Sequence, residues 1–289
     1  MQKILVIADA AETCCATPRG LELAALFGID VDVVAFAYTP LRALELNAAK
    51  EAAVRKRLLA EREHSMQAQI DKYQRKGQKV RLKTVWEKNI DQWVIKRCSS
   101  DKYIGVIKSG SGTGSLVHTS IDWLLLRKCP IPVLLVAKKR WHRTKPVLVA
   151  LDLGTTVKSK QTLNSKILGV SRTLSEALGV ELKIISAIEI PTLLADLDLV
   201  DPIAYVKEEK AKMQPQIAKL AAAHDMPEEA FHCKHGPTEK VITSYAANVR
   251  AQIVVMGTVA RRGVKARLLG NTAERVLQHM KTDVLAIKP

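Results

Sequence analysis

Short apolar runs rich in Val, Ile and Leu alternate with longer amphipathic stretches, most clearly in the second half of the chain. The short runs predict buried strands, and the stretches with apolar residues three and four positions apart predict helices. The predicted strands are 146–152, 181–188, 230–235, 252–255 and 283–287, and the predicted helices are 160–178, 201–224, 237–248 and 271–280. Gly179 suits a helix end, and Pro202 suits a helix start. This alternation indicates a parallel sheet with helices on both faces.

The first half follows the same alternation. Residues 45–76 predict one long charged helix, and residues 80–86 predict a strand. The regular spacing of Glu, Lys and Arg along that helix is typical of a face exposed to solvent. The first half is therefore expected to form the same kind of α/β layer as the second.

The chain contains two copies of one unit. KILVIAD at 3–9 resembles PVLVALD at 146–152, and two further pairs of segments match with a constant offset of 151 residues. Those pairs are ALFGIDVDVVAFA at 25–37 with EALGVELKIISAI at 176–188, and VLLVAK at 133–138 with VLAIKP at 284–289. Three matches in the same order indicate a tandem repeat. The charged stretch KKRWHRTK at 138–145 suits a linker, so we expect domains at 1–140 and 145–289.

A basic loop marked by glycines, MGTVARRGVKARLLGNTAERVL at 256–277, links the fourth predicted strand of the second copy to its last helix. Gly257 follows the strand and Gly270 precedes the helix. Glycine backbone, a helix N-terminus and nearby basic residues together attract phosphate. Asn271 and Glu274 also form a capping-box pattern, which would stabilise the helix without any ligand. The residues therefore leave two interpretations open, an anion site or a plain strand-to-helix connection.

The tandem unit, the strand-end aspartates Asp9 and Asp152, and this loop resemble the universal stress protein family over essentially the whole chain. The resemblance implies an α/β fold with two tandem domains of the adenine-nucleotide alpha-hydrolase-like type. Each would be a five-stranded parallel sheet with helices on both faces. The resemblance also implies a stress-response protein that binds an adenine nucleotide of the ATP type in its second domain.

The family's ATP-binding signature is G-x2-G-x9-G-[S/T] before the last helix. Gly257 and Gly270 fit its first and third glycines, and Ala260 replaces the second. Asn271 replaces the Ser or Thr, with Thr272 next to it. If position 260 requires a positive φ, alanine costs about 1 kcal/mol there.

By the same resemblance, eight residues of the second domain would form the nucleotide site. Asp152 and Ala187 would meet the adenine side. The others follow the path from the ribose to the phosphates: Met256, Gly257, Ala260, Gly270, Asn271 and Thr272.

The first copy lacks this signature. At the offset of 151, the counterparts of Gly257, Ala260, Gly270 and Asn271 are Val106, Ser109, Thr119 and Ser120. The glycine-rich run SGSGTGS at 109–115 is out of register, and no G-K-[S/T] follows it as in a P-loop. It is interpreted either as a connector or as a ligand loop. Because Asp9 is kept, a pocket with a different ligand stays an open alternative.

The formal net charge of +16 is uneven, with +12 on residues 1–150 and +4 on the rest. Such a basic half would attract polyanions, so an RNA- or DNA-binding module without a nucleotide site is the alternative function. Aromatic residues make up only 4% of the chain, whereas single-strand binders use them for base stacking. Trp141 is the candidate stacking residue, and Trp86 and Trp123 are expected in the core.

No catalytic site is expected. The chain has no G-x-S-x-G elbow, and the segment DAAETCCATPRG at 9–20 has no histidine for adenylyl transfer. A weak ATPase is the enzymatic alternative. FHCKH at 231–235 puts only two ligand-type residues on one face of a strand, fewer than zinc sites use, so no metal is expected.

Five cysteines without a C-x-x-C pair argue against a disulfide framework. No apolar run reaches the ~18 residues of a membrane helix, and acidic residues interrupt the first run too early for a secretory signal. We therefore expect a cytoplasmic protein without membrane contact. The resemblance implies that family domains pair through their last strands. Val133–Val136 and Val284–Ile287 would then form a pseudo-dimer within one chain, and two chains could form a homodimer.

Overall fold

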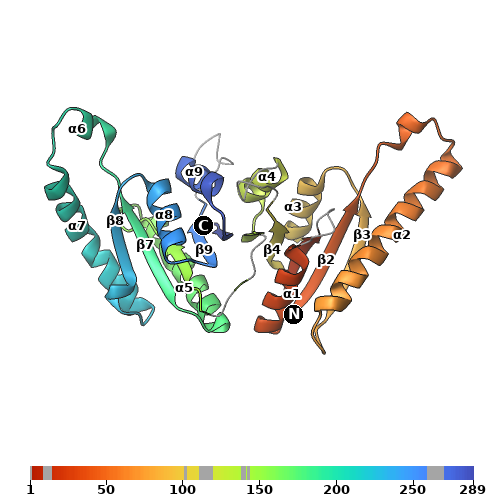
Figure 1. The fold of residues 1–289 in the computed structure, drawn as a ribbon, viewed down its shortest axis with the longest axis horizontal. Helices are drawn as coiled ribbons and strands as arrows, with labels where there is room; N and C mark the ends of the chain where they lie inside the picture. The colour runs from red at the N-terminus through yellow and green to blue at the C-terminus, as the bar shows by residue number, and fades with distance from the viewer. Residues whose placement is uncertain are drawn as a thin grey trace. The chain divides into compact units, whose positions relative to one another are not determined.

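The computed structural model describes residues 2–8, 15–100, 103–110, 120–137, 141, 144–258 and 270–289, except the side chains of residues 42, 43 and 195. The described residues form two compact units (Figure 1). The first contains the strands β1 to β5, and the second contains β6 to β10.

The first unit is a five-stranded sheet in the order β3-β2-β1-β4-β5, and its neighbouring strands are parallel. Its strands are β1 (Lys3–Ala8), β2 (Asp30–Ala37), β3 (Val80–Trp86), β4 (Tyr103–Ser109) and β5 (Val133–Val136). Its helices are α1 (Ala16–Phe27), η1 (Leu41–Leu44), α2 (Ala48–Tyr73), α3 (Ile90–Ser100) and α4 (Ser120–Lys128). Right-handed crossovers put α1 and α2 on one face and α3 and α4 on the other. The contacts of α1 with α2 and of α3 with α4 agree with that arrangement.

The second unit repeats this topology, with the strand order β10-β9-β6-β7-β8. Its strands are β6 (Val147–Ala150), β7 (Leu182–Ile188), β8 (Phe231–His235), β9 (Ile253–Gly257) and β10 (Asp283–Ile287). Its helices are α5 (Lys158–Leu178), α6 (Thr192–Asp196), α7 (Pro202–Ala223), η2 (Glu228–Ala230), α8 (Thr238–Asn248) and α9 (Asn271–His279). The predicted fold, a parallel sheet with helices on both faces in each copy, is confirmed.

Local sequence signals explain several helix ends. Gly179 ends α5 with a φ of 65°, the left-handed conformation that glycine adopts without a Cβ clash. The Asp201 carboxylate accepts the backbone N–H groups of Ile203 and Ala204, and Pro202 occupies the first position of α7. The short helix α6 was not predicted.

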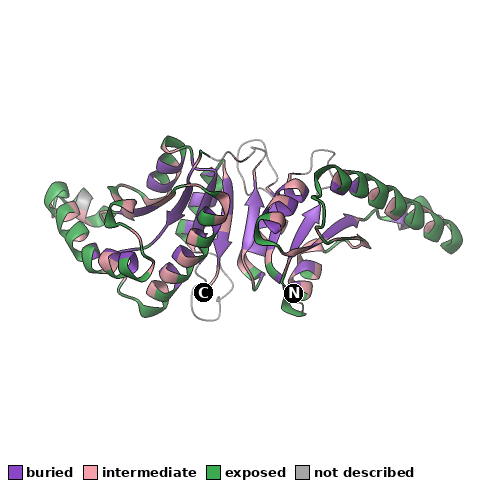
Figure 2. Cartoon of the chain, turned by 90° about the horizontal axis from the view of Figure 1, so that it is seen from below, coloured by how far each residue is buried: buried purple, intermediate pink, exposed green. Residues whose placement is uncertain are grey.

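The core of each unit is formed by the strands and the helix faces that cover them (Figure 2). The long helix α2 contributes little to it, because Met66 and Ile70 are its only fully covered residues. The predicted solvent-exposed face of this helix is therefore confirmed. Within the part of the chain that the structure describes, no helix is long and apolar enough to cross a membrane.

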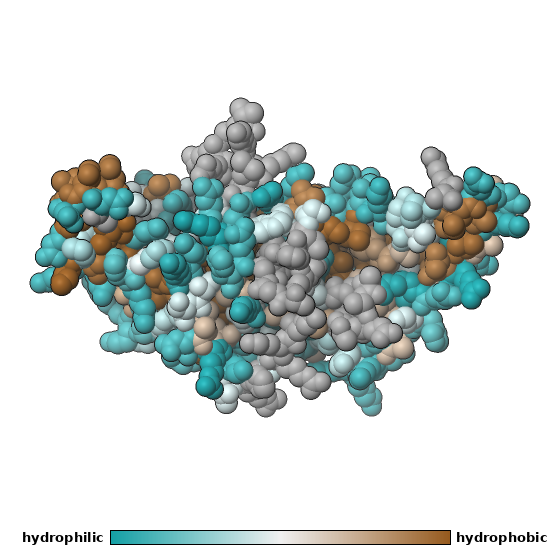
Figure 3. Space-filling model, turned by 45° about the horizontal axis from the view of Figure 1, so that its top comes forward, coloured by the Kyte–Doolittle hydropathy of each residue, from teal (hydrophilic) through white to brown (hydrophobic). Residues whose placement is uncertain are grey.

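An exposed apolar surface lies on α6 and the start of α7. Figure 3 shows it as a brown area at the left end of the view. Its most exposed members are Leu193, Leu197, Leu199 and Ile203, with relative exposures of 58 to 82%. Three aspartates lie along the same segment, at positions 196, 198 and 201.

A polar cluster joins three strands of the first unit. Lys3 Nζ lies 2.8 Å from Asp32 Oδ2, and the Tyr103 hydroxyl donates to the same oxygen. Burial alone would raise the pKa of Asp32, but the hydrogen bonds from Lys3 and Tyr103 outweigh it and hold the pKa below its ordinary value. The ionised carboxylate therefore stabilises the fold above the unfolded-state pKa of about 4, and this contribution is lost as the pH falls through the lower, folded-state pKa.

Asp32→Asn is expected to destabilise the protein by about 1–2 kcal/mol at pH 7. The difference from the unmodified protein should shrink as the pH falls below about 4, because both proteins then carry an uncharged group at this position. Urea denaturation at a series of pH values measures it. A difference that does not change with pH would contradict the assigned role of the charge.

Candidate functional site

The strand order of the second unit reverses between β6 and β9, and a cavity of about 500 Å³ lies at the carboxyl ends of these strands. Parallel α/β sheets bind ligands at this kind of position, because the flanking helices diverge there. The cavity is lined by residues from the ends of β6, β7 and β9 and from the helices α5, α8 and α9.

Asp152 stands at the rim, two residues beyond the end of β6. Its backbone carbonyl accepts a hydrogen bond from the side-chain amide of Asn164 at 2.8 Å, and Asn164 is buried in α5. Its carboxylate pairs with Lys160 Nζ at 3.0 Å. Lys160 and Asn164 are four positions apart on one face of α5, so this helix fixes the backbone of Asp152 and places a cation beside the cavity.

Gly257, at the end of β9, lies directly under α5. A Cβ atom at this position would lie 3.0 Å from Ile167 Cδ1 and 3.0 Å from Leu163 Cδ2. The residue is not among the glycines with a positive φ. The close approach of α5 therefore favours glycine here, because Leu163 and Ile167 would have to shift to make room for a Cβ atom.

Helix α9 begins beside the cavity at a glycine, which has no side chain to cap it. Gly270 is the N-cap, with φ of −66° and ψ of 141°, and its carbonyl accepts the Glu274 N–H at 3.0 Å. The predicted cap at Asn271 is wrong, because Asn271 is already the first residue of the helix. A glycine N-cap has no oxygen to accept the first-turn amides, so the positive end of the helix dipole faces the cavity uncapped by that residue. Thr272 and Ala273 line the cavity there.

The remaining rim is acidic. The Thr238 hydroxyl, at the start of α8, donates to Glu189 Oε2 at 3.0 Å. The described lining thus holds two carboxylates, from Asp152 and Glu189, and one cation, Lys160. The loop's four basic residues, Arg261, Arg262, Lys265 and Arg267, lie outside the described residues.

Comparisons with known proteins agree on one family. The pattern described as "Universal stress protein family" matches residues 144–288. The chain is 30% identical over 243 residues to universal stress protein E from Salmonella typhi, covering 82% of this chain and 77% of that protein. It is 28% identical to the universal stress protein E homolog of Haemophilus influenzae over 250 residues, covering 84% of this chain and 81% of the homolog. The chain belongs to the universal stress protein family.

Solved structures support the same fold over the whole chain. A functionally unknown protein from Pseudomonas aeruginosa PAO1 has a TM-score of 0.73 at 23% identity, covering 100% of this chain and 92% of its own. A putative universal stress protein from Pseudomonas aeruginosa UCBPP-PA14 has a TM-score of 0.71, also at 23% identity, with coverages of 100% and 93%. These likenesses extend the universal stress protein fold to both halves of the chain.

The cavity brings together most of the residues that the sequence singled out. Those that line it are Asp152, Ala187, Met256, Gly257, Gly270 and Thr272. Asn271 is exposed and is not part of the lining, and Ala260 lies outside the described residues. The sequence analysis missed the polar lining residues Lys160, Asn164, Glu189 and Thr238. Lys160 and Asn164 are four residues apart in the predicted helix that follows the strand-end Asp152, and this spacing could have identified both as cavity residues.

The first unit aligns with the second differently from the prediction. In the first unit, Val106 of β4 pairs with Leu5 of β1 and Val133 of β5. In the second unit, Val254 of β9 pairs with the corresponding residues, Leu148 of β6 and Val284 of β10. Val106 and Val254 are therefore equivalent, and 148 positions separate them. Placing Val106 opposite Gly257 was therefore wrong, and Ser109 stands there instead. The Ser109 hydroxyl accepts the N–H of Ala16, at the start of α1.

The offset returns to 151 after the loop, because α4 begins at Ser120 and α9 at Asn271. Ten residues separate Ser109 from Ser120, and thirteen separate Gly257 from Asn271. The glycine-rich run at 109–115 therefore begins in register with the loop of the second unit. The structure does not describe residues 111–119, nor Asp9.

In the first unit, a buried ion pair stands at the positions that correspond to two cavity-lining residues of the second unit. At these offsets Lys108 corresponds to Met256 and Asp122 to Ala273, and both of those residues line the cavity of the second unit. Lys108 Nζ lies 2.7 Å from Asp122 Oδ1, with side-chain exposures of 9% and 0%. Asp122 lies in the first turn of α4, where the helix dipole favours a negative charge. The first unit thus carries a buried carboxylate where the second has Ala273.

The tryptophans differ from expectation. Trp86 and Trp123 are half-buried rather than in the core. The Trp141 indole N–H donates to Asp283 Oδ2 at 2.8 Å, so one edge of the candidate stacking residue is engaged within the second unit.

In FHCKH, the Cys233 thiol contacts the Met213 sulfur at 3.8 Å. The described residues contain no group of three or more His, Cys, Asp or Glu that would hold a metal.

Proposed function

We propose that the second unit binds an adenine nucleotide of the ATP type in this cavity, and that the chain acts in the stress response by binding rather than by catalysis. Membership of the universal stress protein family supports the role in the stress response. The observation that carries the nucleotide proposal is the cavity itself. It lies where the strand order reverses and is bordered by the first turn of α9, whose N-cap is a glycine.

The proposed orientation follows the chemistry of the lining. The adenine lies between Asp152 and the end of β7 at Ala187, where a carboxylate and a backbone carbonyl accept hydrogen bonds from an exocyclic amine. The ribose follows Met256 and Gly257. The phosphates lie at the start of α9, where Gly270 allows close approach and the helix dipole stabilises negative charge.

Gly270→Asp is expected to weaken ATP binding by tenfold or more, since a carboxylate about 4 Å from a phosphate costs about 1–4 kcal/mol. The same substitution should leave adenosine affinity unchanged, because adenosine carries no phosphate. The fold should persist, since the backbone angles at Gly270 suit any residue and aspartate is a favoured N-cap. Isothermal titration of the full chain with ATP and adenosine measures both affinities.

Gly270→Asn is the matched control, because asparagine has the size and capping ability of aspartate without its charge. ATP affinity should be much closer to that of the unmodified protein in this variant. Equal ATP affinities for the Asp and Asn variants would contradict the assignment of the phosphates to α9. A lack of ATP binding by the unmodified protein at millimolar concentration would contradict the proposal as a whole.

The nucleic-acid alternative has no supporting observation in the described residues. The weak-ATPase alternative is tested by single-turnover measurement of ADP, which is expected to stay at background. Pairing through Val133–Val136 and Val284–Ile287, and a homodimer, stay predictions from the family resemblance.

A further inference from the structure

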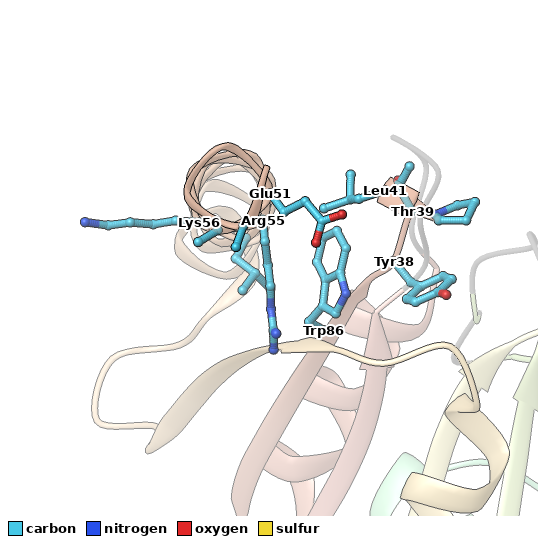
Figure 4. A pocket seen from close by; sticks show the side chains of 11 residues that line it. Tyr38, Thr39, Leu41, Glu51, Arg55, Lys56 and Trp86 are labelled. Atoms are coloured by element: carbon cyan, nitrogen blue, oxygen red, sulfur yellow. The ribbon is translucent and has the colours of Figure 1, made fainter. Parts of the chain in front are cut away.

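A second cavity, of about 590 Å³, lies in the first unit at the carboxyl ends of β2 and β3 (Figure 4). One wall is a single face of α2, formed by residues 48, 51, 52, 55, 56 and 59, whose spacing is that of one helical stripe. The other walls come from the chain after β2 and from the last residue of β3. Its volume is in the range of small-molecule sites.

Two aromatic side chains form the floor of this cavity. Ala37 and Trp86 are register partners on β2 and β3, so Tyr38, one residue on, meets the indole with ring centroids 5.8 Å apart. Tyr38 is 46% exposed and Trp86 is half-buried. Leu41 and Leu59 add apolar surface. The cavity thus presents aromatic and aliphatic surface that remains accessible to a ligand.

One carboxylate and one guanidinium flank the indole. Figure 4 shows the Glu51 carboxylate directed at one end of the Trp86 ring and the Arg55 side chain passing the other end. The Arg55 guanidinium lies 5.6 Å from the Trp86 ring centroid. The Lys56 side chain points away from the cavity in the same view.

Neither flanking charge is neutralised by another side chain that the structure describes. Within the described side chains, Glu51 and Arg55 have no ion-pair partner, whereas Arg57 and Glu61 further along α2 pair with each other at 2.8 Å. An unpaired carboxylate and an unpaired guanidinium at the two ends of an aromatic surface complement a ligand with the opposite charges at the same spacing.

We propose that this cavity binds an aromatic zwitterion, a small molecule with one aromatic ring, one ammonium group and one carboxylate, as in an aromatic amino acid. The ring packs against Tyr38 and Trp86. The ammonium group pairs with Glu51, and the carboxylate pairs with Arg55. The charges of Glu51 and Arg55 are opposite, so this pair suits a ligand that carries one charge of each sign.

This site is separate from the proposed nucleotide site. It lies in the first unit, and only Tyr38, which corresponds at the offset of 151 to Glu189, has a counterpart among the described residues that line the other cavity. The counterpart of the nucleotide cavity in the first unit is the Lys108–Asp122 region, which does not line it. The inference therefore holds whether or not the second unit binds ATP.

Isothermal titration of the full chain with three probes tests the assignment. The probes are L-phenylalanine, 3-phenylpropionate, which lacks the ammonium group, and phenethylamine, which lacks the carboxylate. Phenylalanine is expected to bind with a dissociation constant of about 1 mM, given its size. Glu51→Gln should weaken phenylalanine about tenfold and leave phenylpropionate unchanged. Arg55→Gln should weaken phenylalanine and phenylpropionate and leave phenethylamine unchanged.

Arg57→Gln and Glu61→Gln are matched controls on the same helix, because neither residue lines the cavity, and both should leave all affinities unchanged. Tyr38→Ala, at an exposed position after β2, should weaken all three probes without unfolding the unit. Equal effects of the Glu51 and Arg55 variants on all three probes would overturn the charge assignment. No phenylalanine binding at about 10 mM, or its displacement by ATP, would overturn the proposal.

Discussion

Asp122→Ala is expected to destabilise the first unit by about 3–5 kcal/mol, the largest effect of any single substitution proposed for this chain. The substitution leaves the Lys108 ammonium, only 9% exposed, without its carboxylate at 2.7 Å. A buried charge that loses its partner keeps its desolvation cost and loses the compensating attraction. Urea denaturation followed by tryptophan fluorescence measures it. Trp86, Trp93 and Trp123 all lie in the first unit, and only Trp141 lies in the second.

The double variant Lys108→Met with Asp122→Ala is the decisive control. It installs the residues that the second unit carries at the same two positions, Met256 and Ala273. Replacing both members of a buried ion pair by apolar residues is often close to neutral. We therefore expect the double variant to recover most of the lost stability. Additive losses in the double variant would mean that the two groups do not depend on each other.

Gly257→Val is expected to destabilise the second unit by about 1–3 kcal/mol and to abolish nucleotide binding there. Its Cβ alone would stand 3.0 Å from two methyl groups of α5, and the two γ-methyl groups add to the crowding. To relieve the contact, the side chains of Leu163 and Ile167 must shift, and both of them line the cavity. Thermal unfolding and ATP titration of the same preparation report the two effects.

Gly105→Val in β4 is the comparison for this substitution. Gly105 also lies in a strand, but among the described residues a Cβ there would meet only the Pro132 carbonyl oxygen, at an ordinary 3.6 Å. It should therefore cost much less stability. Leu163→Ala added to Gly257→Val should restore part of the lost stability by making room beside the strand. If the two glycine substitutions have equal effects, close approach of α5 is not the reason for Gly257.

Local signals were enough to predict the architecture. The alternation of apolar runs and amphipathic stretches gave the parallel sheets, and Gly179 and Pro202 marked helix boundaries that the structure has within a few residues. The family resemblance, carried in part by the strand-end position of Asp152 and the glycines flanking the loop, named six residues that line one cavity. Each of these features depends on residues close together in the sequence or on a rule of the fold class.

Features that depend on contacts between distant segments were not predictable in the same way. The reason for Gly257 lies in α5, about ninety residues earlier, so the loop sequence alone suggested backbone freedom instead. The offset of 148 residues between β4 and β9 could be recognised only from the pairing of each strand with its neighbours in the sheet. In the sequence, Lys108 and Asp122 are ordinary charged residues, and only the packing of α4 against the sheet shows that they form a buried ion pair. The cavity at Trp86 could not be predicted from the sequence either, because its walls come from the ends of two strands and from one face of a helix.

The three-residue difference between the loops after β4 and β9 has an evolutionary consequence. All of the length change falls between a strand and a helix that keep their places, so neither sheet nor helix has to adjust. By the entropy of loop closure, a connection of thirteen rather than ten residues costs only about 0.2 kcal/mol more to close. A duplicated gene of this kind can therefore lengthen or shorten this connection by a small insertion or deletion while the scaffold of both halves stays the same.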